Sequence, residues 1–106
     1  MNAQKKDETK IADIEEVILK KPLLIDGKEI NSLTLDFGGL TGNDMEGAEA
    51  EVIASGINIT GPHEVNKTYL LAIAARASKI NINDLRSLSI KDAATITLMV
   101  QGFLLN

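Results

Sequence analysis

The sequence predicts a small α+β domain, in which an N-terminal β-hairpin is followed by a small bundle of three main α-helices. Two stretches rich in β-forming residues, over about 16–37, are separated by the turn signal Asp26-Gly27. After Gly38-Gly39 the spacing of apolar residues changes from every second residue to that of a helix. The chain then carries three helical segments, at about 42–55, 65–79 and 89–105.

Most apolar residues of the hairpin fall at odd positions on both arms, among them Val17 and Leu19 on the first and Leu33 and Leu35 on the second. Residues directly opposite one another share a face of the sheet, so odd positions should pair with odd positions. A two-residue loop between the arms would pair odd with even. We therefore expect an odd-membered loop, with Gly27 in the left-handed position of a bulge.

Capping signals mark the starts of two helices. Thr41 is followed three residues later by Asp44, and Ser89 by Asp92, which is the spacing of a capping box. Between the second and third main helices, the stretch Asn81-Ile82-Asn83-Asp84 predicts a break followed by a short helical turn at about 84–88. The second helix is apolar throughout Tyr69–Ala75, which predicts a helix that other elements or a partner surround.

Length and composition predict a single domain over 15–106, preceded by a flexible N-terminal tail over 1–14. The 106 residues carry a net charge of −4 and no basic stripe, and aromatic residues are only 3% of the chain, so nucleic-acid binding is not expected. No apolar run is long enough for a membrane span, and no apolar leader opens the chain. The lack of cysteine fits a reducing cytoplasm.

The residues with catalytic or ligating potential give no pattern typical of an enzyme. His63 stands alone in a loop, without a nucleophile and an orienting acid nearby in the sequence, and we expect it to be solvated. The carboxylates of the first helix are spread around it, which favours a solvated face over a metal site. Gly38, Gly39 and Gly42 lack the spacing of a phosphate-binding loop. We therefore expect no catalytic residue, no cofactor and no metal.

The last two main helices carry more apolar residues than one small core obviously needs. Two interpretations remain open: a compact core over the hairpin, or a groove or oligomer interface for a partner. The main apolar stripe of the last helix lies along one side of it and consists of Ile90, Ala93, Ala94, Ile96, Thr97, Val100, Phe103 and Leu104. Residues that lie off this stripe are the candidates for partner binding. They are one of Leu70 and Leu71, together with Met99 and Leu105.

The order of the motifs resembles the small tail assembly chaperones of Mu-like and related contractile-tailed phages and prophages. The matching stretches are Leu19 to Leu35, Leu40 to Asp44, Ala72 to Ala77, and Asp92 to Leu105. The resemblance implies a non-enzymatic protein of the host bacterial cytoplasm. It would bind the tape measure protein, a very long helical chain that sets tail length, and keep it soluble until the tail tube assembles around it.

Two other functional classes fit the same residues. One is a small structural tail or baseplate component that stays in the phage particle, and the other is a host regulatory adaptor that binds proteins. The pattern leaves open whether the chain also forms a homo-oligomer. Mass spectrometry of purified particles separates the first class from a chaperone, because a chaperone is absent from finished particles. The gene neighbourhood separates the second class, because the gene of a tail chaperone should lie between those of the tail tube and the tape measure protein.

Overall fold

The computed structural model describes residues 12–106, so the expected tail at 1–14 lies mostly outside the described residues. Strand β1 (Ile14–Ile25) pairs antiparallel with β2 (Lys28–Asp36) in a two-stranded sheet. The strand thus starts one residue before the expected boundary of the domain. The elements that follow are α1 (Gly42–Ala54), the 3-10 helix η1 (His63–Val65), α2 (Lys67–Ser78), α3 (Ile82–Leu85) and α4 (Ile90–Leu105). The predicted α+β class, a hairpin followed by three main helices, is confirmed.

The helices begin close to where their capping residues predict. The backbone N–H of Thr41 donates to the Asp44 carboxylate at 2.9 Å before α1, and the N–H of Asp92 donates to Ser89 Oγ at 3.3 Å in α4. The second main helix starts later than the expected residue 65, because η1 comes first and Asn66 then caps α2. The short helical turn expected at 84–88 instead lies at α3, a few residues earlier.

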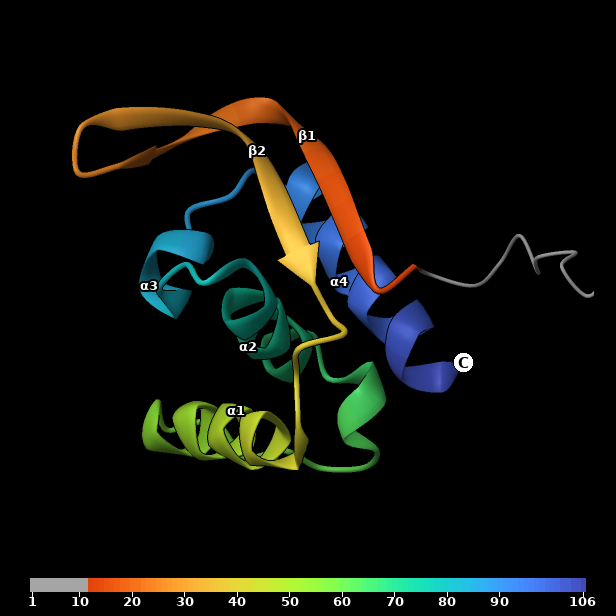
Figure 1. The fold of residues 1–106 in the computed structure, drawn as a ribbon. Helices are drawn as coiled ribbons and strands as arrows, with labels where there is room; N and C mark the ends of the chain where they lie inside the picture. Colours follow the sequence, from red (N-terminus) through yellow and green to blue (C-terminus); the bar gives the residue numbers. More distant parts are fainter. Residues whose placement is uncertain (1–11) are drawn as a thin grey trace, which may run out of the picture.

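Helix α2 lies at the centre of the fold (Figure 1). It packs against α1 on one side, against β2 of the hairpin on the other, and against α4 beside it. Seven of its twelve residues are buried, so neighbouring elements cover most of the apolar run predicted from the sequence. The core also includes the inner face of the hairpin, with Leu33, Leu35 and Phe37 almost fully buried.

The turn of the hairpin differs from the odd-membered loop expected from the sequence. Ile25 pairs with Lys28 across a two-residue turn, and both turn residues have positive φ, Asp26 at 51° and Gly27 at 79°. This is the geometry of a type I′ turn, whose twist matches that of the two strands. The positive φ expected for Gly27 is confirmed, but the expected loop length was wrong.

A bulge in β1 restores the pairing that the apolar pattern requires. Near the turn Leu23 pairs with Ile30, whereas farther along Ile18 pairs with Ser32, so residues 19–22 of β1 lie opposite residue 31 alone. Beyond this bulge odd positions face odd positions, as in the pair of Val17 with Leu33. The expected inner face, with Val17, Leu19, Leu33 and Leu35 buried, is confirmed. The bulge contains Pro22, which cannot donate to a strand ladder.

The buried carboxylate of Asp92 holds this bulge against the start of α4. One of its oxygens accepts the backbone N–H of Lys20 at 2.9 Å, and the other accepts the N–H of Lys21 at 3.1 Å and the Ser89 hydroxyl at 2.9 Å. The side chain is 2% exposed. Asp92 therefore satisfies backbone groups that the bulge removes from the ladder, besides its predicted place at the start of the helix.

Gly27 provides a test of the turn. A Cβ added at Gly27 would touch nothing within 4 Å, but its φ of +79° is costly for a residue with a side chain. We expect Gly27→Ala to lower the free energy of unfolding by about 1 kcal/mol, measured by urea denaturation. Gly42→Ala is the matched control, since Gly42 opens α1 with equally free space and no positive φ. An equal loss in both variants would contradict the type I′ turn.

Candidate functional site

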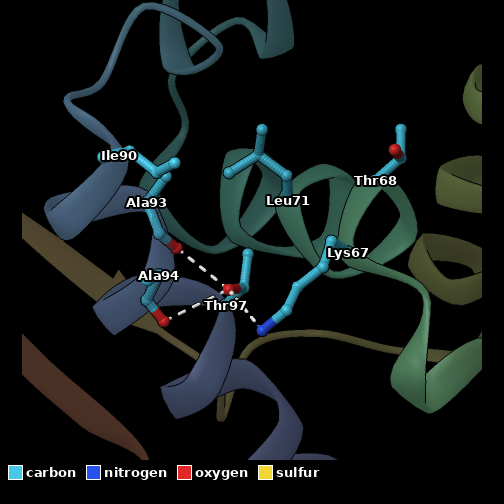
Figure 2. A pocket seen from close by; sticks show the side chains of 7 residues that line it. All are labelled: Lys67, Thr68, Leu71, Ile90, Ala93, Ala94 and Thr97. Atoms are coloured by element: carbon cyan, nitrogen blue, oxygen red, sulfur yellow. Dashed lines mark hydrogen bonds between the residues drawn. The ribbon is translucent and has the colours of Figure 1, made fainter.

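An apolar groove lies between the first turns of α2 and the first half of α4 (Figure 2). Its volume is about 410 Å³. Leu71 of α2 forms part of one wall and is half-buried, while Ile90 of α4 stands at the mouth with 85% of its surface exposed. The complete lining is Lys67, Thr68, Leu71, Ile90, Ala93, Ala94 and Thr97.

The polar groups of the groove are largely satisfied within the chain. The hydroxyl of the buried Thr97 donates to two carbonyl oxygens, that of Ala93 at 2.9 Å and that of Ala94 at 3.2 Å. It accepts a hydrogen bond from Lys67 Nζ at 3.4 Å. A threonine on a helix commonly satisfies its hydroxyl in this way. The groove therefore presents mainly methyl and methylene groups, with one ammonium group at its edge.

The four residues predicted to bind a partner do not form one surface. Leu70 is 0% exposed, so it belongs to the core and the choice between Leu70 and Leu71 falls on Leu71. Neighbouring residues of a helix point about 100° apart, and this rotation turns Leu70 inward and Leu71 toward the groove. Met99 is half-buried against the core, and Leu105 is 64% exposed near the C-terminus. Leu105 lies about 16 Å along the helix axis from Ala94 and thus far from the groove.

Sequence reasoning missed Ile90, the most exposed large apolar residue among those described. Ile90 falls within the apolar stripe expected for this helix, but at the edge of the residues that are buried in the structure, Asp92, Ile96, Thr97 and Val100. Burial also requires a neighbouring element at the same height along the helix axis. The pattern gives angles around the helix and contains no signal for such a neighbour.

A second pocket, of about 450 Å³, lies between α1, η1 and the start of α2. His63 is not simply solvated as expected, because its Nε2 lies 3.1 Å from Glu49 Oε2 and its ring meets the Tyr69 ring edge-on with centroids 5.1 Å apart. The pocket is lined by Met45, Glu46, Glu49, Pro62, His63, Glu64 and Tyr69. Burial raises the pKa of the Tyr69 hydroxyl, and the charges of Glu64 and Glu49 raise it further.

The other carboxylates of α1 join it to α2. Arg76 donates to Asp44 at 3.1 Å and to Glu51 at 2.9 Å, and its guanidinium crosses α1 at Gly47, where a Cβ would overlap it. The pKa of Asp44 is lowered first by the hydrogen bond from the Thr41 backbone and then by the one from Arg76. The face of α1 expected to be merely solvated therefore forms ion pairs. Within residues 12–106, no three histidine, aspartate or glutamate side chains are grouped so that they could hold a metal ion.

In the part of the chain that the structure describes, no helix has the length and apolar character needed to cross a membrane. Comparisons with protein-family models, with curated protein sequences and with solved structures gave no match to the chain.

Proposed function

We propose that this protein is a tail assembly chaperone of a contractile-tailed phage or prophage. In this role it is not an enzyme: it binds the tape measure protein in the host bacterial cytoplasm and keeps it soluble during tail assembly. The order of the motifs over most of the chain supports this family. The observation that carries the binding role is the apolar groove between α2 and α4, with Ile90 unprotected at its mouth.

The chemistry of the groove fits an apolar face of a helical client. Leu71, Ala93 and Ala94 give it a lining of aliphatic groups, and the Thr97 hydroxyl is already satisfied inside the chain. An amphipathic helix places side chains at spacings of three and four residues into grooves of this kind. Covering Ile90 with a client would remove a large apolar side chain from water, which favours binding.

Co-expression with the tape measure protein tests the proposal. We expect Leu71→Asp and Ile90→Asp each to weaken binding by about tenfold or more and to leave the tape measure protein in the insoluble fraction. Because Ile90 is exposed, Ile90→Asp should change the free energy of unfolding by no more than about 0.5 kcal/mol. A charge placed at Ile90 should therefore remove binding without unfolding the protein.

Leu98→Asp is the matched control, since Leu98 is 63% exposed on the same helix and does not line the groove. Leu105→Asp tests the candidate residue that lies far from the groove. If folded Leu71→Asp and Ile90→Asp variants still keep the tape measure protein soluble, the groove is not the binding site. If mass spectrometry finds the protein in purified particles, a structural tail component replaces the chaperone.

A further inference from the structure

The pocket between α1 and η1 is lined by both apolar and acidic residues. Its apolar surface comes from Met45, Pro62 and the Tyr69 ring. Glu46 and Glu49 of α1 lie on one side, and Glu64 lies in η1 on the other. Three glutamates and a single histidine thus line the pocket, in a chain whose net charge is already −4, and Glu49 is the one in contact with His63.

Tyr69 adds a hydroxyl group to the lining of this pocket. The side chain is buried, with 3% of its surface exposed, and it lines the pocket beside the His63 ring. Its hydroxyl makes no hydrogen bond with the residues that the structure describes, yet it is not a buried atom that lacks a partner, so the oxygen is not sealed inside the core. Burial raises the pKa of Tyr69 most, and the negative charges of Glu64 and Glu49 raise it further. A cationic hydrogen-bond donor would satisfy both the hydroxyl oxygen and the carboxylates.

We propose that this pocket binds an arginine side chain of a partner polypeptide. The aliphatic stem of the arginine would lie on Met45 and Pro62, as long basic side chains do on apolar surfaces. The planar guanidinium would lie against the aromatic rings and donate to the carboxylates and to the Tyr69 oxygen. A lysine ammonium can form the ion pairs but cannot stack in the same way.

The surroundings of the pocket favour a polypeptide over a small free cation. Met45 is 53% exposed and Val65, next to the pocket in η1, is 56% exposed. Apolar side chains that flank an arginine in a polypeptide can cover both, which adds apolar burial to the ion pairs. The pocket is separate from the apolar groove between α2 and α4, because the pocket and the groove share no lining residue.

An NMR titration of the isotope-labelled full chain tests whether the pocket binds the positive charge of an arginine side chain. The probes are Nα-acetylarginine amide and its uncharged isostere Nα-acetylcitrulline amide. We expect the arginine probe to shift the amide signals of Glu49, His63 and Tyr69 with saturation in the millimolar range, as suits a single side chain. The citrulline probe should bind at least about tenfold more weakly, since it lacks the charge. Equal binding of both probes, or no shift at these residues, would overturn the proposal.

Variants with equal net charge separate the pocket from general attraction. Glu49→Gln/Glu64→Gln should weaken binding of the arginine probe by about tenfold. The control Glu16→Gln/Glu29→Gln removes two exposed carboxylates from the hairpin and should change the affinity by less than about twofold. Tyr69→Phe keeps the ring and should weaken binding by about threefold through loss of one hydrogen bond. If both double variants weaken binding equally, the arginine probe is attracted by the net charge of the protein and not by the pocket, and the proposal is wrong.

A peptide that contains arginine tests whether the ligand of the pocket is a polypeptide or a small free cation. Ac-Leu-Ala-Arg-Ala-Leu-NH2 should bind about tenfold more tightly than the arginine probe, because its leucines can cover Met45 and Val65. Equal affinities would assign the pocket to small cations instead. The Ile90→Asp variant should bind this peptide with unchanged affinity. The result for the pocket therefore does not depend on whether the α2–α4 groove binds the tape measure protein.

Discussion

Replacing Asp92 by asparagine is expected to lower the free energy of unfolding by about 3 kcal/mol, the typical cost of breaking a buried, charge-assisted hydrogen-bond network. The carboxylate accepts the N–H groups of Lys20 and Lys21 and the hydroxyl of Ser89. An asparagine offers one acceptor oxygen and turns an NH2 group toward donors. Urea denaturation at pH 7 measures the loss.

The control for this prediction is Lys20→Ala, which removes the side chain but keeps the backbone N–H. We expect it to change the free energy of unfolding by no more than about 0.5 kcal/mol, because Lys20 is exposed. A loss as large as that of Asp92→Asn would show that the lysine charge, and not the backbone hydrogen bonds, holds the bulge.

The loss of stability expected for Asp92→Asn depends on pH. Burial alone would raise the pKa of Asp92, but hydrogen bonds from the backbones of Lys20 and Lys21 and from Ser89 outweigh it and leave the pKa below its ordinary value of 3.8. A lowered pKa in the folded state stabilises the protein above the pKa of the unfolded chain, and this contribution is lost as the pH falls through the folded value. The difference between wild type and Asp92→Asn should therefore shrink below about pH 4.

Replacing Phe37 by alanine is expected to cost about 3–5 kcal/mol of stability, as for other large aromatic residues in cores. Phe37 is 1% exposed, and its ring stacks on Phe103 of α4 with centroids 4.7 Å apart and planes 17° from parallel. Its backbone N–H also donates to the Asp13 carbonyl at 2.7 Å. The residue thus joins the end of the hairpin to the last turns of α4.

A double-mutant cycle isolates the contact between the two rings. Phe37→Leu and Phe103→Leu, alone and combined, should give a coupling of about 1 kcal/mol beyond the burial of each side chain. Thermal and urea denaturation of the four proteins provide the free energies. Additive losses would mean that each ring contributes through its own burial and that the stacking itself adds nothing.

The hairpin illustrates which part of a fold a pattern can predict. Alternation in the sequence correctly assigned Val17, Leu19, Leu33 and Leu35 to one face, because burial imposes the pairing parity. The same pattern predicted the wrong way of pairing odd positions with odd positions, because it favoured an odd-membered loop. A two-residue turn with a bulge gives the same faces as an odd-membered loop, and the bulge depends on Asp92, 72 positions from Lys20 in the chain. Local pattern carries no information about such a distant partner.

The candidate sites depended on tertiary structure even more strongly. The sequence named Leu71 as one of two alternatives, and the core packing of Leu70 decided between them. Ile90 was placed on the main apolar stripe, and the structure shows it exposed at the mouth of the groove. The acidic pocket was not predicted, since it brings Glu49, His63 and Tyr69 together from α1, η1 and α2.

The sequence by itself determined the α+β class, the positions of the hairpin and three main helices, and the capping residues of α1 and α4. These follow from spacing, turn residues and caps, which act over a few residues. Only the tertiary structure decided which apolar residues stay exposed and which polar residues share a pocket. The physical reason is that both depend on which elements lie side by side, and packing between distant segments sets that arrangement.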